Sequence, residues 1–160
     1  MVLSGHSDAG YLNKTRDHSH AIAHIFSSED DPMPRHNGLI LTISKIIKFV
    51  MYSATEAKLS AIFITAKKMV PLRQTIVEMR WLQPTSPLKN DNYTADRVTN
   101  NTIVTRQTKD MDIRFYWLRC CATQYQFRFS WAPGGLNWGN CNTKHHPPLY
   151  HEAHRHTHAG

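Results

Sequence analysis

The sequence predicts an α/β domain built on a mixed sheet of five strands. Three observations lead to this fold class. Short runs are rich in branched apolar residues, one long segment has apolar residues at helical spacing, and strand and helix patterns alternate in the second half of the chain. With 160 residues, the chain can bury a substantial core but is too short for two comfortable domains.

The candidate strands share branched or alternating apolar side chains and are bounded by polar segments. They are residues 2–7, 20–26, 39–43, 87–91 and 126–131. Polar residues at 13–19 and the proline-containing stretch 27–37 predict loops between the first three. The first strand is expected to end in a turn at Asp8-Ala9-Gly10.

The strongest helix signal begins near Ser53. Either Ser53 or Thr55 is a candidate N-cap, and apolar residues then recur at spacings of three and four as far as Met79. Pro71 lies inside this pattern and predicts either a kink or two stacked helices. Shorter helices are expected at 93–101, 111–123 and 136–144, the last one after a turn at Pro133-Gly134-Gly135.

The charge balance favours a polyanionic partner. Lys and Arg number 19 against 12 Asp and Glu, so the net charge is +7. A surplus of this size favours nucleic acid first and an anionic membrane second. The most apolar stretch, residues 39–50, contains two lysines and is too short to span a bilayer. No signal-peptide pattern begins the chain, so we expect an intracellular protein, cytoplasmic or nuclear, with no membrane partner.

The cysteines and histidines do not form the spacing patterns of a disulfide framework or a metal site. Cys120 and Cys121 are adjacent and Cys141 is alone, so the sequence has no CxxC pair and free thiols are expected. Six histidines between residues 145 and 158 could hold a borderline metal such as Zn²⁺ or Ni²⁺, but their irregular spacing favours a flexible tail. We therefore expect a domain over residues 1–144 and a His-rich tail over 145–160.

Three acidic residues occupy places in this outline where functional sites form. Asp8 follows the first strand, Glu56 begins the long helix, and Asp91 ends the fourth strand. Strand ends and helix starts tend to meet at one edge of an α/β sheet. Carboxylates gathered there would hold Mg²⁺ or Mn²⁺. The spacing alone leaves open whether these acids share a site or are solvated surface residues.

Five segments of the chain resemble the ribonuclease H domain of copia-type LTR retrotransposon Pol polyproteins. They occur in family order, together cover about residues 4–148, and are Ser7-Asp8-Ala9, Ser53-Ala-Thr-Glu56-Ala57, Asp91-Asn92-Tyr-Thr-Ala95, Thr108-Lys-Asp-Met-Asp-Ile-Arg114 and Asn137-Trp-Gly-Asn-Cys-Asn-Thr-Lys144. One such segment would be weak evidence, whereas five in register are strong. The resemblance implies a ribonuclease H-like fold and metal-dependent cleavage of the RNA strand of RNA–DNA hybrids.

In that family, four carboxylates bind two divalent metals, one activating water and the other stabilising the leaving 3′ oxygen. By this resemblance Asp8 would bridge both metals, Glu56 would hold one, and Asp91 would hold the water-activating one. The fourth position is Asn140, whose oxygen can ligate Mg²⁺ but brings no negative charge. The resemblance thus implies two Mg²⁺ or Mn²⁺ ions at these four catalytic positions, with activity weakened by Asn140.

Other acids could in principle replace the missing carboxylate. Asp110 and Asp112 lie on the preceding predicted helix, although Asp112 matches a family position outside the metal set, and Asp96 is a further candidate. Met1 lies seven residues before Asp8, as in a reading frame that starts at an internal methionine. Together with the asparagine at position 140, this start suggests an isolated, degenerate copy of the domain.

Basic residues in the second half of the chain are the candidates for a hybrid-binding surface, namely Arg106, Lys109, Arg114, Arg119 and Arg128. They would contact phosphates without reading sequence, while 2′-hydroxyl contacts would identify the RNA strand. The alternative is a general solvated basic face. Two functions follow: a weakened ribonuclease H-type endonuclease or a non-catalytic nucleic-acid-binding remnant. No small-molecule cofactor is expected, and the oligomeric state is left open.

Overall fold

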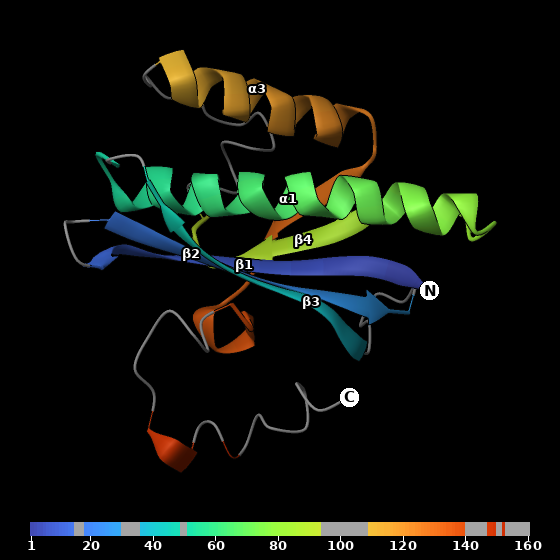
Figure 1. Cartoon of the computed structure of the whole chain (residues 1–160), viewed down its shortest axis with the longest axis horizontal. Coiled ribbons are helices and arrows are strands. Elements are labelled where there is room, and N and C mark those ends of the chain that lie inside the picture. The colour runs from blue at the N-terminus through green and yellow to red at the C-terminus, as the bar shows by residue number, and fades with distance from the viewer. Residues whose placement is uncertain are drawn as a thin grey trace.

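The computed structural model describes residues 1–14, 18–29, 36–48, 51–93, 109–139, 147–149 and 152. These residues form one sheet with two helices on the same side of it (Figure 1). The elements in chain order are β1 (Val2–Lys14), β2 (His18–Ser28), β3 (His36–Ile47), α1 (Ala54–Glu78), β4 (Ser86–Asn90), α3 (Lys109–Thr123), β5 (Phe127–Trp131) and a 3₁₀ turn (Gly134–Leu136).

The sheet is mixed and has the strand order β3-β2-β1-β4-β5. β1 pairs antiparallel with β2, and β2 pairs antiparallel with β3. The β1–β4 and β4–β5 pairs are parallel, and helices α1 and α3 lie in the connections that parallel pairing requires. The predicted five-stranded mixed sheet with flanking helices is therefore confirmed.

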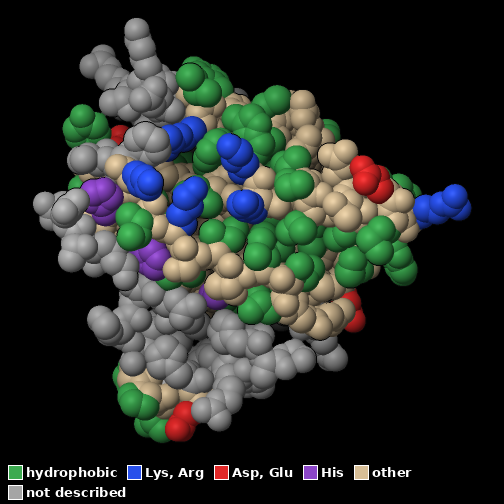
Figure 2. All heavy atoms as spheres, in the orientation of Figure 1, with side chains coloured by type: hydrophobic (Ala, Val, Ile, Leu, Met, Phe, Trp, Pro, Cys, Tyr) green, Lys and Arg blue, Asp and Glu red, His purple; other side chains and the backbone are tan. Residues whose placement is uncertain are grey.

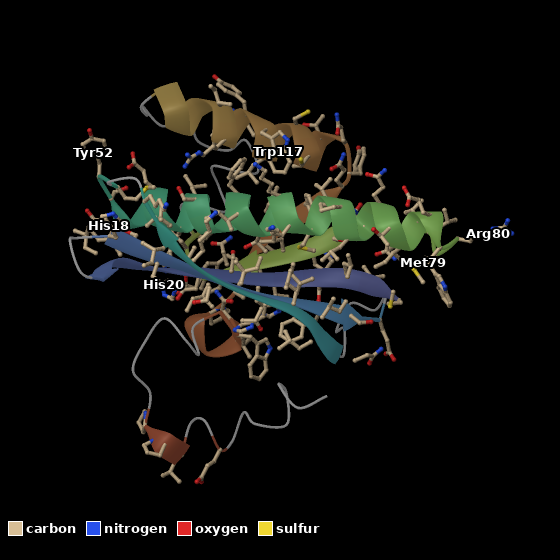
Figure 3. The ribbon with its side chains drawn as sticks, viewed as in Figure 1. His18, His20, Tyr52, Met79, Arg80 and Trp117 are labelled. Carbon is tan, nitrogen blue, oxygen red and sulfur yellow. The ribbon has the colours of Figure 1, made fainter. Side chains whose placement is uncertain are left out.

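An apolar core fills the space between the sheet and the helices. Its buried side chains come from every layer and include Leu3, Ile25, Ile62, Met69, Leu88, Leu118, Phe127 and Phe129. Between the two helices, Trp117 packs edge-on against Phe63 with the ring centroids 5.3 Å apart (Figure 3). Burying a large apolar side chain contributes about 1.5–3 kcal/mol, so this core holds the helices on the sheet.

Helix α1 is one continuous helix, so the alternative of two stacked helices is wrong. Ser53 is the N-cap, and its side chain accepts a hydrogen bond from the backbone N–H of Glu56. Pro71 lies inside the helix, where a proline costs about 3 kcal/mol. The buried residues Ile62 and Met69 hold α1 on the sheet, and their burial offsets that cost. Neither α1 nor α3 is long and apolar enough to cross a membrane.

Strand β1 continues through the turn expected at residues 8–10, so that expectation was wrong. Asp8 is paired with Ile22 inside the β1–β2 ladder, and Gly10 is paired with His20. Pairing with β2 outweighs the local turn preference of the Asp-Ala-Gly sequence. The loop expected at 13–19 is shorter for the same reason, because β1 reaches Lys14 and β2 begins at His18.

The segment after β5 also differs from the expected helix at 136–144. Its described part, residues 136–139, ends a 3₁₀ turn and is not α-helical. The side chain of Asn137 accepts a hydrogen bond from the N–H of Gly139, and such local bonds compete with helix formation. The helix expected at 93–101 lies almost wholly outside the described residues, whereas α3 confirms the helix at 111–123.

Candidate functional site at Asp8, Lys58 and Asp91

Asp8 and Asp91 meet where β1 runs beside the end of β4. The two parallel strands pair His6 with Lys89, so each aspartate lies two residues beyond that pair. The side chain of Asp8 is 1% exposed and that of Asp91 is 8% exposed. Carboxylates buried to this degree require a compensating charge or hydrogen-bond donors.

Lys58 supplies that charge from the first turns of α1. Its Nζ lies 3.4 Å from Oδ1 of Asp8 and donates a hydrogen bond to Oδ1 of Asp91. Its side chain is 19% exposed, so the ammonium is largely withdrawn from water. One cation therefore bridges the two carboxylates, and the group carries one net negative charge.

Glu56 contacts a different part of the chain from the one expected. Its Oε2 accepts the backbone N–H of Tyr52 at 2.9 Å, while its own N–H donates to Oγ of Ser53 at 3.2 Å. The first bond ties Glu56 to the residue before the N-cap, and the second is the N-cap bond of Ser53 at the start of α1. The Glu56 carboxylate thus satisfies a backbone donor at the helix N-terminus.

Helix geometry explains why Lys58 reaches the aspartates. Each residue of an α-helix is rotated by about 100° from the one before it, so two positions span about 200°. Positions 56 and 58 therefore lie on different sides of α1. Position 58 lies four residues before Ile62 and seven before Thr65, both of which are buried. Glu56 likewise lies four residues before the buried Ser60, so no spacing in the sequence identifies Lys58 by itself.

The described residues form no ready metal-binding group. Among them, no three His, Cys, Asp or Glu side chains lie together as a group that could hold a metal ion. Asp8 and Asp91 lie together and are paired with the Lys58 ammonium. Glu56 bonds to the backbone instead, so the use of these carboxylates as metal ligands stays a prediction. Asn140, Asp96 and the side chains of Asp110 and Asp112 lie outside the described part of the chain.

The segment that leads to position 140 packs directly on Asp8. Nδ2 of the buried Asn137 donates to the backbone oxygen of Ser7 at 2.9 Å, and the N–H of Trp138 donates to Nδ1 of His6 at 3.2 Å. A Cβ atom on Gly139 would lie 2.9 Å from the backbone nitrogen of Asp8. Glycine is therefore required there, and residues 137–139, the described start of the last segment of the sequence resemblance, lie against the candidate site.

The described basic residues of the predicted hybrid surface have different neighbours. On α3, the guanidinium of Arg114 lies 5.7 Å from the centroid of the Phe63 ring, and that of Arg119 lies 4.2 Å from the centroid of the Phe115 ring. Arg128 is exposed on β5. Arg106 and the side chain of Lys109 lie outside the described residues. The hybrid surface therefore remains a prediction.

The fold is that of ribonuclease H domains. A ribonuclease H1 isolated from compost by a metagenomic approach has a TM-score of 0.64 at 11% identity, with 89% of this chain and 91% of that chain covered. The N-terminal ribonuclease H domain of a Mycobacterium tuberculosis protein has a TM-score of 0.59 at 14% identity, with 84% of each chain covered. A ribonuclease H1 in complex with an RNA/DNA hybrid has a TM-score of 0.60 at 9% identity, with 85% and 88% covered.

The sequence itself is similar to a retrotransposon polyprotein. It is 26% identical over 118 residues to the retrovirus-related Pol polyprotein from transposon TNT 1-94 of Nicotiana tabacum. The match covers 74% of this chain and 8% of that polyprotein, so the chain corresponds to a short part of its relative. No protein-family model matches the chain. The resemblance read from the five segments is confirmed by this similarity together with the fold.

Proposed function

We propose that this chain is an RNA–DNA hybrid-binding domain of the ribonuclease H type in which cleavage is lost. Hybrid binding is supported by the fold, by the similarity to a Pol polyprotein and by the net charge of +7. A neighbour with the same fold was crystallised with an RNA/DNA hybrid. The single observation that carries the loss of cleavage is the Lys58 ammonium bridging Asp8 and Asp91.

An ammonium in this place works against a divalent cation. Two like unit charges about 4 Å apart repel by about 4 kcal/mol at an effective dielectric constant near 20, and a divalent ion doubles that to about 8 kcal/mol. Lys58 also brings three N–H donors that can satisfy carboxylate oxygens without a metal. Its ion pairs therefore make the aspartates a structural unit joining α1 to the sheet rather than a pair of free metal ligands.

The remaining sequence features agree with a binding module. Asn140 would add no charge to the site even if its oxygen faced the aspartates. Binding would rest on phosphate contacts by cations, for which Arg106, Lys109, Arg114, Arg119 and Arg128 remain the candidates. We place the end of this domain at residue 144, with residues 145–160 as a separate tail.

A binding and cleavage assay on the same substrate tests the proposal. A short fluorescein-labelled RNA–DNA hybrid is titrated with the chain by anisotropy in EDTA, and cleavage is then followed with Mg²⁺ and with Mn²⁺. We expect binding that weakens as salt is raised and no cleavage above that of Asp8→Asn. Wild-type cleavage that Asp8→Asn abolishes would reveal an active nuclease, and absence of binding at low salt would refute the binding function.

The role of Lys58 is tested by restoring acids. Lys58→Glu combined with Asn140→Asp replaces the ammonium with a carboxylate and supplies the acid that position 140 lacks, so divalent-dependent cleavage should rise above background. Lys67→Glu combined with Asn140→Asp is the matched control, because Lys67 is exposed on the same helix and the charge change is identical. Equal activity in both double variants would show that Lys58 does not suppress the site.

A further inference from the structure

A basic surface lies where β3, α1 and α3 meet, and it includes Arg114, one of the candidate hybrid-binding residues. It surrounds a cavity of about 580 Å³ that shares no lining residue with the group of Asp8, Lys58 and Asp91. Figure 2 shows Lys and Arg side chains gathered on one face among hydrophobic ones. We call this cavity and its rim the β3 pocket.

The charge of the β3 pocket has one sign. Its cations are Lys45, Lys48, Lys67, Lys68 and Arg114, and none of the described residues that line it is acidic. The four lysines are exposed, while the arginine guanidinium lies over the Phe63 ring. Because these positive charges repel one another, an anionic occupant would stabilise the surface.

Apolar side chains also line the pocket. Among them are Phe63, Ile64 and Pro71 of α1. An occupant that carried only charge would leave this apolar surface in water, whereas one with both acidic and apolar groups would bury it. The lining therefore favours a ligand in which the two kinds of group alternate.

Strand β3 adds an open edge to the same surface. It is the outermost strand in the order β3-β2-β1-β4-β5, and over the described ranges no other strand pairs with its outer side. Along it, Ile40, Leu41 and Ile46 are 44%, 36% and 49% exposed. An edge strand of this kind offers backbone N–H and C=O groups to a second extended chain.

We propose that the β3 edge and the β3 pocket bind an extended acidic peptide segment of a partner protein. The peptide would add to the sheet as a further strand. Lys45 pairs with Ala21 on the face covered by α1, and Ile46 pairs with His20 on the opposite face. Side chains alternate along a strand, so acidic residues would meet Lys45 and Lys68 while the intervening apolar residues meet Ile40 and Ile46.

Other occupants use less of this surface. A nucleic acid would engage the cations but leave the β3 backbone and its exposed isoleucines unpaired. A second copy of the chain would bring one net charge of +7 against another and would place lysines next to lysines. Charge complementarity and the open edge together therefore select an acidic peptide.

The probe for this proposal is a short fluorescein-labelled peptide of alternating Glu and Ile, followed by anisotropy. Two comparison peptides are a block peptide of the same composition and an alternating peptide that is N-methylated on every second residue. We expect saturable binding of the unmodified alternating peptide only. The block peptide cannot place its acidic and apolar side chains on opposite faces of a strand, and the N-methylated peptide lacks backbone N–H donors. Equal binding of all three would show simple charge attraction and would overturn strand addition.

Charge reversal locates the binding surface. Lys45→Glu with Lys68→Glu should weaken peptide binding by about tenfold or more, equivalent to about 1.4 kcal/mol. The matched control reverses two exposed charges elsewhere, Arg80→Glu with Arg128→Glu, and should keep the affinity for the peptide. Arg80 lies at the far end of α1 from His18 and Tyr52 (Figure 3).

Two further measurements exclude the other occupants. If single-stranded DNA or RNA bound more tightly than the peptide, and if the Lys45→Glu, Lys68→Glu variant lost that binding, the surface would belong to nucleic acid. If size-exclusion chromatography showed a dimer that the same variant abolished, the surface would be a self-association site. Either result would overturn the proposal. The binding of the peptide is measured apart from that of the hybrid, so each proposed function can fail alone.

Discussion

The two faces of the sheet bury different mixtures of side chains. On the face covered by α1, Leu3 and Ile25 are fully buried in an apolar cluster. On the opposite face of the same two strands, His6 is paired with His24, and Asp8 lies two residues further along β1. All of these side chains are buried. The comparison teaches that the opposite face mixes buried apolar side chains, such as Ile22 and Phe26, with buried polar groups that need specific partners.

The polar face meets that need with hydrogen bonds between neighbouring strands. Nδ1 of His24 lies 3.1 Å from Oγ1 of Thr42, and Nε2 of His20 lies 2.9 Å from Oγ of Ser44. Buried polar groups cost free energy unless they are bonded in this way. Lys58 connects the helix layer to this face, because its backbone is in α1 and its ammonium lies between the buried carboxylates of Asp8 and Asp91.

The largest expected effect on stability is from Lys58→Met, which removes the cation that links α1 to the aspartates of the sheet. Breaking a buried ion pair leaves an uncompensated charge and should cost about 4 kcal/mol of unfolding free energy. Urea unfolding measures the loss. Mn²⁺ should raise the melting temperature of this variant more than that of the wild type, because the freed carboxylates can then take a cation. An unchanged stability would contradict the structural role of the pair.

On the apolar face, Ile62→Ala should cost about 3 kcal/mol, since the side chain is fully buried and its removal leaves a cavity. Urea unfolding again provides the measurement. Val77→Ala on the same helix is the control, because Val77 is 45% exposed and should change stability little. Equal effects at the two positions would show that α1 does not pack as described.

On the polar face, His24→Ala should cost about 2 kcal/mol, because it leaves Thr42 without its bond and opens a cavity. A comparison with Thr42→Ala and the double variant isolates the pair. We expect the double variant to lose less than the sum of the two single losses. Additive losses would show that the two side chains do not interact.

At the start of α1, Ser53→Ala should cost about 1 kcal/mol through the lost N-cap. Glu56→Gln, which keeps an oxygen acceptor for Tyr52, should be milder. Both variants should bind the RNA–DNA hybrid as the wild type does. A strong effect of Glu56→Gln on Mg²⁺- or Mn²⁺-dependent cleavage would instead show that Glu56 is a residue of the functional site.

The smallest effect concerns thiol reactivity. Burial, together with the neighbouring Cys120, raises the pKa of Cys121 to about 11, so little of its thiol is ionised at mildly alkaline pH. Cys120 is exposed. Iodoacetamide should therefore label Cys120 first in the folded chain, and tandem mass spectrometry can locate the modification. Labelling of both at one rate would show that α3 does not bury Cys121.

Periodicity and capping patterns predicted much of the fold. The apolar spacing after Ser53 predicted α1, and the alternation of Phe127 and Phe129 with polar residues predicted β5. The strand ends were less predictable. Asp8-Ala9-Gly10 has the composition of a turn, yet its pairing with β2 keeps it extended. Local propensity differs by fractions of a kcal/mol between such states, so tertiary pairing decides.

The sequence by itself determined the sheet-and-helix architecture and the basic charge, and it pointed to Asp8 and Asp91 as candidate site residues. These features depend on composition and on patterns that repeat along the chain. Only the tertiary structure decided which charged residue of α1 meets the aspartates. Glu56 and Lys58 are two positions apart, and the rotation of about 200° between them places one at the helix cap and the other against the sheet. That rotation replaces an expected acid with a cation and so changes the chemistry proposed for the site.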